Sequence, residues 1–232
     1  MISLLLAAFF SASAAEYGPT IEGDFVVAES IEASDTGVVG CSDQQLNDGI
    51  QLPDLPLFFT RTQADHAWGS REMVELLVDT ARHMRWLMPD ASSITIGEIS
   101  RQRGGELSGH KTHRGGVDAD VGIYLSGGRQ QAGMFLDPGP REFDVEANWA
   151  LISAMLDTGR VDMLLLDHSH IARLKAYTLE AGLLTEEEAS QIFLGDHRGN
   201  YRATGVIRHA PAHRDHLHVR VLCPDGSRAS LR

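Results

Sequence analysis

Five of the eleven histidines fall in two short segments, 109–120 and 213–220. An imidazole can ligate a metal ion or transfer a proton near neutral pH, so such clusters indicate a metal site, an acid–base site or both. The clustered residues are His110, His113, His213, His216 and His218. An isolated histidine is more often a surface or hydrogen-bonded residue, and we assign no chemical role to His66, His83, His168, His170 and His197.

The first cluster runs from a Gly-rich loop into a predicted strand. His113 stands at the end of the loop, and Asp118 and Asp120 are two positions apart on the strand. Side chains alternate between the two faces of a strand, so both carboxylates should point to the same side. A carboxylate from the strand can then meet an imidazole from the loop.

The second cluster places His216 and His218 at strand spacing, which puts both imidazoles on one face of a sheet. Catalytic zinc is usually held by three nitrogen or oxygen ligands and leaves a fourth position open. His113, Asp120 and His218 supply two nitrogens and one oxygen, a set that favours one catalytic zinc ion. His216 then has the chemistry of a general base.

Motifs for other common chemistries do not occur in the chain. It has no HExxH helix motif, no Gly-x-Ser-x-Gly elbow, no Walker A loop and no Gly-x-Gly-x-x-Gly after a strand. With only two cysteines, a Cys-rich structural zinc site is excluded as well.

The elements around these clusters predict an α+β fold: a single domain with a central, mostly antiparallel sheet and flanking helices. Ser70 is a predicted N-cap, and Thr185 with Glu188 matches a capping box. A long surface loop is expected from Ser126 to Asp144, which is rich in Gly and Pro. We expect helices from Ser70 to before Pro89, Val145–Thr158, Ile171–Ala181 and Thr185–Phe193, and strands at Ser93–Ile99, Val117–Leu125, Val161–Leu166 and His216–Leu222.

The N-terminal region predicts export. Residues 1–15 combine a short apolar run with small residues at the end, as in a cleavable signal peptide. The run is shorter than the roughly 18–20 apolar residues of a membrane-spanning helix, so we expect a mature protein without a transmembrane segment. Residues 16–56 are polar and weakly periodic and predict an extended N-terminal arm, followed by a domain at 57–232 that contains both histidine clusters.

The net charge and the cysteine content limit the classes of binding partner and bear on the redox compartment of the protein. The formal net charge of −12 makes nucleic acid a poor partner. In an oxidising compartment Cys41 and Cys223 could form one disulfide, although two separate buried thiols fit the sequence too.

The motifs of both clusters resemble the penicillin-insensitive murein endopeptidases. This family is part of the LAS superfamily, which includes lysostaphin, the D-Ala-D-Ala peptidases and the hedgehog domains. The resemblance covers most of the mature chain. It is carried by Gly104-Gly105, Gly109-His110, Thr112-His113, Gly116-Val117-Asp118-Ala119-Asp120, His213-Arg214, His216-Leu217-His218-Val219-Arg220 and Cys223-Pro224.

The resemblance implies a periplasmic enzyme that hydrolyses D-alanyl-meso-diaminopimelyl cross-links in peptidoglycan. It implies zinc on His113, Asp120 and His218, His216 as the catalytic base, and His110 and His213 lining the site. Substrate carboxylates would be bound by arginines near these motifs, because guanidinium pairs with carboxylate in a bidentate manner. The predicted substrate-binding residues are Arg103, Arg114, Arg214 and Asp118.

Two other functions remain open at this point. The same zinc site would serve a D,D- or L,D-carboxypeptidase that trims peptidoglycan stem peptides. A non-catalytic, zinc-stabilised cell-wall-binding protein is the alternative from another class, since function belongs to the site rather than to the fold.

Overall fold

The computed structural model describes residues 41, 44–60, 64–130, 134–139, 141–194 and 205–229. A six-stranded sheet with the order β2-β4-β5-β8-β6-β7 forms its centre. The inner pairings β4–β5, β5–β8 and β8–β6 are antiparallel, and the edge strands β2 and β7 run parallel to their neighbours. The strands are β2 Phe58–Thr60, β4 Ile94–Ile96, β5 Asp118–Gly122, β6 Val161–Leu166, β7 Ile207–His209 and β8 His216–Val221.

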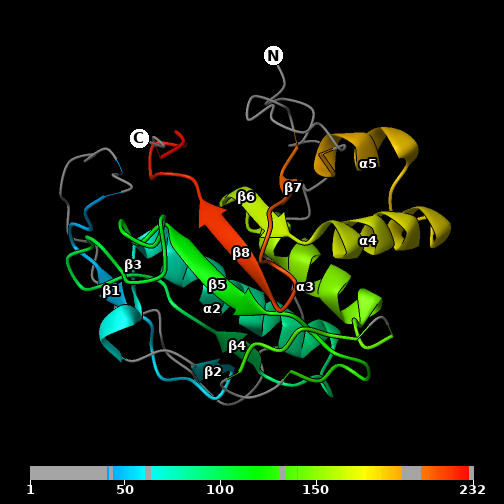
Figure 1. Ribbon diagram of the computed structural model, residues 1–232, viewed down its shortest axis with the longest axis horizontal. Helices are drawn as coiled ribbons and strands as arrows, with labels where there is room; N and C mark the ends of the chain where they lie inside the picture. The colour runs from blue at the N-terminus through cyan, green and yellow to red at the C-terminus, as the bar shows by residue number, and fades with distance from the viewer. Residues whose placement is uncertain are drawn as a thin grey trace. The chain divides into compact units, whose positions relative to one another are not determined.

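Helices cover one face of this sheet, so the predicted α+β class is confirmed. In Figure 1 the helices α2 (Arg71–Leu87) and α3 (Val145–Asp157) lie behind the sheet, while β5 and β8 face the viewer. Leu217, Val219 and Val221 of β8 belong to the hydrophobic core with the buried residues of both helices. The alternate residues of β8 therefore point to the opposite face.

Two further helices follow β6. They are α4 (His168–Glu180) and α5 (Glu186–Ile192), and α4 packs against α3 and β7. The predicted capping box at α5 is confirmed, because Thr185 and Glu188 exchange side-chain and backbone hydrogen bonds. The prediction for α4 began three residues late, since the Asp167 side chain caps the helix by accepting the N–H of Ser169.

Local signals also set the ends of α2 and α3. The Ser70 hydroxyl accepts the N–H of Met73 at the start of α2, as expected. Gly159 has φ +69° just after α3, which is the left-handed conformation that a glycine adopts at low cost. Strand pairing covers Ile94–Ile96 in β4 and Asp118–Gly122 in β5, so both strands are shorter than predicted.

The described part of the predicted arm packs against the domain. Leu46 and Leu52 are buried, and β1 (Ile50–Gln51) pairs with β3 (Trp68–Gly69) in a small second sheet close to the short helix η1 (Ala64–His66). A disulfide joins Cys41 to Cys223, with their Cα atoms 5.2 Å apart. The predicted signal peptide 1–15 and residues 16–40 of the arm lie outside the described residues.

Among the described residues, no helix combines the length and the apolar character needed to cross a membrane.

Candidate metal centre and active site

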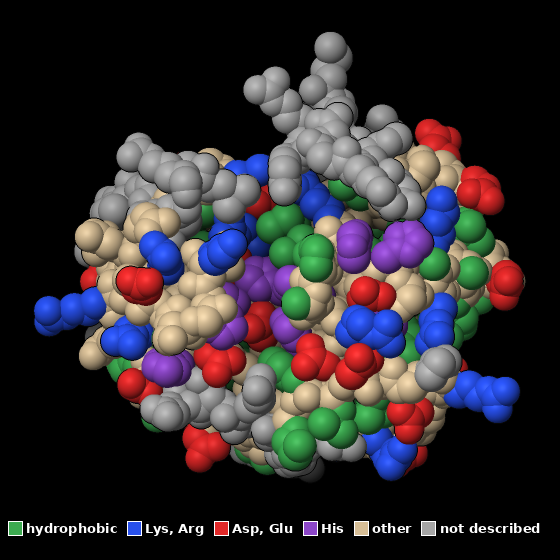
Figure 2. Space-filling view, in the orientation of Figure 1, with side chains coloured by type: hydrophobic (Ala, Val, Ile, Leu, Met, Phe, Trp, Pro, Cys, Tyr) green, Lys and Arg blue, Asp and Glu red, His purple; other side chains and the backbone are tan. Residues whose placement is uncertain are grey.

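The pairing of β5 with β8 brings the two histidine clusters together. Asp120 lies opposite His218, Asp118 opposite Arg220, and Gly122 opposite His216. Directly opposed residues on an antiparallel pair share a face and lie close together. The carboxylates of β5 and the imidazoles of β8 therefore project from the face that α2 and α3 leave uncovered. Figure 2 shows histidine side chains gathered in a hollow at the centre of this face.

The Gly-rich loop between β4 and β5 adds His110 and His113 to this face. His113 is buried, and its Nδ1 donates to the carbonyl oxygen of Ile99 at 3.1 Å. Nε2, on the other side of the ring, points toward Asp120. The loop turns sharply at Gly104, where φ is +70° and a Cβ atom would overlap the carbonyl oxygen of Arg114.

Three buried side chains bring one donor atom each to a common point. Nε2 of His113 lies 3.2 Å from Oδ1 of Asp120 and 3.2 Å from Nδ1 of His218. Nδ1 of His218 lies 3.0 Å from the same Oδ1. Zinc–ligand bonds of 2.0–2.1 Å in a tetrahedron separate the donor atoms by about 3.3–3.4 Å. The triangle is therefore close to the size that one zinc ion requires.

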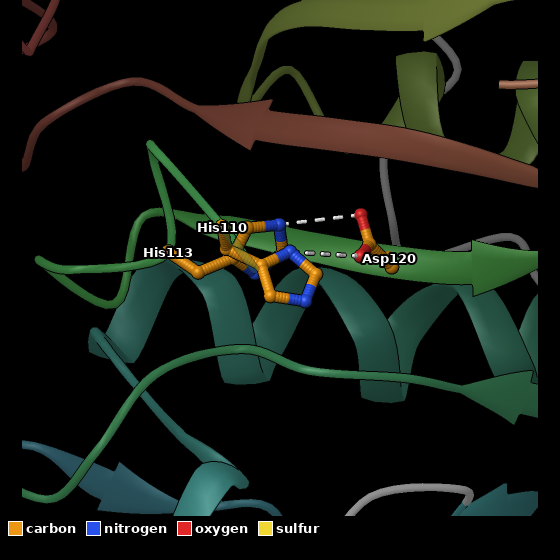
Figure 3. Close-up of side chains that lie close together, drawn as sticks. All are labelled: His110, His113 and Asp120. Atoms are coloured by element: carbon orange, nitrogen blue, oxygen red, sulfur yellow. Dashed lines mark ion pairs between the residues drawn. The ribbon is translucent and has the colours of Figure 1, made fainter. Parts of the chain in front are cut away.

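His110 gives this centre a fourth side chain that could ligate a metal. The set of His110, His113 and Asp120 also fits a metal ion, with one ligand atom from each within 4.8 Å of the others. In Figure 3 both imidazoles lie beside the Asp120 carboxylate, and Nδ1 of His110 is 3.6 Å from Oδ2 of Asp120. On its other side, Nε2 of His110 lies 3.9 Å from a carboxylate oxygen of Glu98.

Asp118 lies behind His218 and does not reach the surface. Its Oδ1 is 2.8 Å from Nε2 of His218, and its two oxygens accept hydrogen bonds of 2.8 Å from Nε and Nη2 of Arg220. Asp118 and Arg220 are both buried. The Asp118 carboxylate contacts His218 and Arg220 in this structure, and substrate binding by Asp118 stays a prediction. A carboxylate bonded to the outer nitrogen of a ligating histidine fixes the orientation of that ring.

Hydrogen bonds and nearby charges strongly polarise this cluster. Burial opposes protonation of His218, but hydrogen bonds and charge from Asp118 and Asp120 outweigh it and raise the pKa of His218 to about 9. Burial would raise the pKa of Asp120, yet hydrogen bonds from His113 and His218 hold that pKa well below its ordinary value. The pKa of Asp118 is lowered too, because the bonds from His218 and Arg220 exceed the effect of burial. These shifts favour ionised carboxylates on Asp118 and Asp120 and a protonated His218 near pH 7.

His216 and His213 line the more open side of the cluster. Nε2 of His216 lies 3.7 Å from Oδ1 of Asp120, and Nδ1 lies 2.7 Å from a carboxylate oxygen of Asp215. The ring of His213 lies 4.9 Å from that of His216, centroid to centroid. Burial, and then the nearby imidazoles, lower the pKa of His213, which keeps this ring neutral near pH 7.

The start of α4 holds the backbone of the loop that carries His213. The N–H of Asp167 donates to the carbonyl oxygen of His213, and Nε2 of His170 donates to that of Arg214, both at 2.8 Å. The buried His170 ring also stacks on Phe143. No chemical role was assigned to His170 from the sequence, and in the structure it has a structural one, because it supports the loop that carries His213. Of the other histidines in that group, His197 lies outside the described residues.

The three predicted substrate-binding arginines lie in different surroundings. Arg103 is exposed and lines an open concavity with residues 44–49. Arg114 donates to the side-chain oxygen of Gln44 at 3.2 Å. The exposed Arg214 pairs with Asp137 at 3.0 Å. Arg114 and Arg214 each directly follow a histidine of the cluster in sequence, and substrate binding by any of the three arginines stays a prediction.

Sequence reasoning assigned no role to four side chains that contact the histidines or aspartates of the site. They are Glu98, Phe135, Asp215 and Arg220. Two had a local signal: Arg220 continues the alternation that puts His216 and His218 on one face, and Asp215 directly precedes His216. Glu98 and Phe135 had no such signal, because they reach the site from other segments.

A family model described as penicillin-insensitive murein endopeptidase matches residues 46–231. This range covers most of the chain and includes both histidine clusters. No match was found among curated proteins.

Proposed function

The chain belongs to the family of penicillin-insensitive murein endopeptidases, and on that premise we propose that it is an exported zinc enzyme that hydrolyses D-alanyl-meso-diaminopimelyl cross-links in peptidoglycan. The family makes the chain a peptidoglycan endopeptidase. The zinc ion, the bond that is cleaved and the export are our proposals.

The observation that supports zinc most directly is the triangle of donor atoms on His113, Asp120 and His218. Their separations of 3.0–3.2 Å are shorter than the 3.6 Å between Nδ1 of His110 and Asp120. We therefore assign these three residues as the ligands and place His110 beside them. Two imidazole nitrogens and one carboxylate oxygen are a typical donor set for catalytic zinc.

The residues around the proposed ligands can serve as the general base and as hydrogen-bond donors. A bound zinc ion supplies Lewis acidity and a water molecule of lowered pKa. His216 turns Nε2 toward the ligand Asp120 and bonds Asp215 through Nδ1, so Nε2 is the nitrogen that accepts the proton of the attacking water. The neutral His213 and His110 can donate hydrogen bonds to the oxyanion or assist the departing amine.

Export is supported by three features. The family acts on peptidoglycan, which lies outside the cytoplasmic membrane. The disulfide between Cys41 and Cys223 is typical of oxidising compartments. Residues 1–15 have the pattern of a signal peptide. We propose that the mature protein is periplasmic and consists of the arm from residue 16 and the peptidase domain at 57–232.

The test is a product analysis on cross-linked muropeptide dimers and free pentapeptides. The mature protein is assayed as isolated, after chelation, and after chelation followed by zinc. We expect zinc to restore the conversion of dimers to monomers. His113→Ala should abolish this conversion, whereas His209→Ala, which changes an exposed histidine of β7, should retain it.

Two results would contradict the proposal. Loss of terminal D-alanine from pentapeptides with intact dimers would show a carboxypeptidase. Zinc-loaded protein that leaves every muropeptide unchanged would indicate a non-catalytic wall-binding protein.

A further inference from the structure

His216 is held by two side chains that have no part in the ligand set. We propose that Asp215 and Phe135 are positioning residues, which together fix the His216 ring with Nε2 toward the donor cluster. This inference rests on the proposed function in one respect, since it takes His216 as the catalytic base.

Asp215 determines which nitrogen of His216 carries the proton. Its carboxylate oxygen lies 2.7 Å from Nδ1, and an ionised carboxylate can only accept a hydrogen bond. The neutral ring therefore keeps its proton on Nδ1 and leaves a free lone pair on Nε2. That lone pair is on the side of the ring near Asp120, 3.7 Å from its Oδ1. Without Asp215 the proton could occupy either nitrogen.

Phe135 restricts the plane of the same ring. The two rings are stacked at an interplanar angle of 17°, with their centroids 5.1 Å apart. The Asp215 hydrogen bond alone would still allow the His216 ring to rotate, and stacking on Phe135 limits that rotation. The hydrogen bond and the stack therefore restrain different movements of one side chain.

The Phe135 ring packs against Gly97, a glycine that lies close in space to the proposed ligand Asp120. A Cβ atom on Gly97 would lie 2.8 Å from two ring atoms of Phe135 and 3.2 Å from Cβ of Asp120. The Phe135 ring therefore occupies the space that a side chain at position 97 would take. The N–H of Gly97 also donates to the carbonyl oxygen of Asp120 at 2.8 Å. The ring that stacks on His216 is thus built against the segment after β4 that hydrogen-bonds to Asp120.

A second contact ties the Phe135 segment to the loop before His216. Nε of Arg214 lies 3.0 Å from a carboxylate oxygen of Asp137. Both side chains are at least half exposed, so the pair adds little stability by itself. It does join residues 134–139 to residues 213–216 at a second point, in addition to the stack of Phe135 on His216.

The experiment combines nitrogen-15 NMR of the histidine rings with steady-state kinetics on muropeptide dimers. In the wild-type protein at pH 8, where an ordinary imidazole is neutral, we expect the His216 proton on Nδ1. Asp215→Ala should produce a mixture of tautomers and lower kcat about 10- to 100-fold with a smaller change in KM, because the base is misplaced rather than the substrate. Asp90→Ala removes an exposed carboxylate in the turn after α2 and should change neither signal nor rate.

A matched pair of variants tests the stack. Phe135→Tyr retains an aromatic ring and should keep a kcat within about threefold of the wild type, whereas Phe135→Leu keeps apolar bulk without a ring and should lower kcat about tenfold. Zinc content and thermal unfolding of each variant show whether the protein is still folded and loaded.

Different results would overturn the positioning roles and the endopeptidase activity. Wild-type NMR with the proton on Nε2, or Asp215→Ala and Phe135→Leu variants with wild-type kcat, would overturn the positioning roles while the endopeptidase activity stands. A zinc-loaded wild type that cleaves no dimer would overturn the proposed function, and the tautomer of His216 would still decide whether Asp215 orients the ring.

Discussion

Nε2 of His218 lies 2.8 Å from Oδ1 of the buried Asp118, so the opposite nitrogen of the ring faces the donor cluster. Arg220 donates hydrogen bonds to both oxygens of Asp118. Asp118 thus connects Arg220 to His218, a proposed zinc ligand. Histidine ligands of zinc commonly bond a carboxylate in this way, and the carboxylate adds to metal affinity.

Asp118→Asn should weaken zinc binding about 10- to 100-fold. The amide is neutral, so it polarises the His218 ring less than the carboxylate does. Competition with a chromophoric chelator measures the affinity. Asp162→Asn is the matched control, because it removes a carboxylate that pairs with Arg228 instead. Equal zinc affinity of the Asp118 variant and the wild type would show that Asp118 does not support the ligand.

Arg220→Met should destabilise the metal-free protein by about 3–5 kcal/mol, since it leaves the Asp118 carboxylate buried without its guanidinium. The double variant Asp118→Leu with Arg220→Met should be less destabilised than the sum of the two single variants, because it removes both charges. Urea unfolding with a chelator present measures all four proteins. Additive losses would mean that the two side chains do not act as a pair.

Gly104→Ala and Gly105→Ala should differ although the two residues are adjacent. Both have positive φ, but only at Gly104 would a Cβ atom overlap another group, the carbonyl oxygen of Arg114. Gly105→Ala should cost about 1–2 kcal/mol from its backbone conformation. Gly104→Ala should cost about 1–3 kcal/mol more and weaken zinc binding, because its loop carries His113. Unfolding and zinc titration test both, and similar results for the two variants would contradict the steric argument.

Replacing both Cys41 and Cys223 by alanine should lower the free energy of unfolding by about 2–5 kcal/mol. The disulfide closes a loop of 182 residues, and long loops lose the most entropy in the unfolded chain. Denaturant unfolding of the double variant and of the oxidised wild type gives the difference. A wild type that unfolds at the same urea concentration with and without reductant would show that the bond contributes nothing.

His170 should make the stability of the protein fall in mild acid. Burial lowers the pKa of His170, and the charges of Arg173 and Arg214 lower it further. The hydrogen bond to the Arg214 carbonyl and the charge of Asp167 raise this pKa, but by less than burial lowers it. A lowered pKa means that the unfolded state binds the proton first, so the contribution of His170 is complete above pH 6.5 and is lost as the pH falls through the folded pKa. Urea unfolding from pH 7.5 to pH 5 should show a smaller loss for His170→Gln than for the wild type. Parallel curves would exclude this role.

Short-range rules were sufficient for most elements of the fold. Ser70 and Thr185 cap helices where their hydroxyls can accept nearby N–H groups, and the run Val161–Leu166 is a strand with the predicted bounds. The edge strands β2 and β7 were not predicted. Each has only three residues and depends on a parallel neighbour that is distant in sequence.

In the site, too, some features follow from local sequence patterns and others depend on contacts between distant segments. Alternation along a strand was enough to put Asp118 with Asp120, and His216 with His218, on shared faces. It could not separate the two carboxylates, because both have the same local pattern. Only the register of β5 against β8 places Asp120 among the donor atoms and Asp118 behind His218.

The sequence by itself therefore determined the residue types of the site, the family and the α+β class, since these depend on chemistry and local periodicity. The tertiary structure alone decided that Cys41 meets Cys223, that Asp118 bonds the outer nitrogen of His218, and that Phe135 stacks on His216. Such contacts join segments far apart in the chain, and they form only when backbone hydrogen bonding and core packing bring those segments into register.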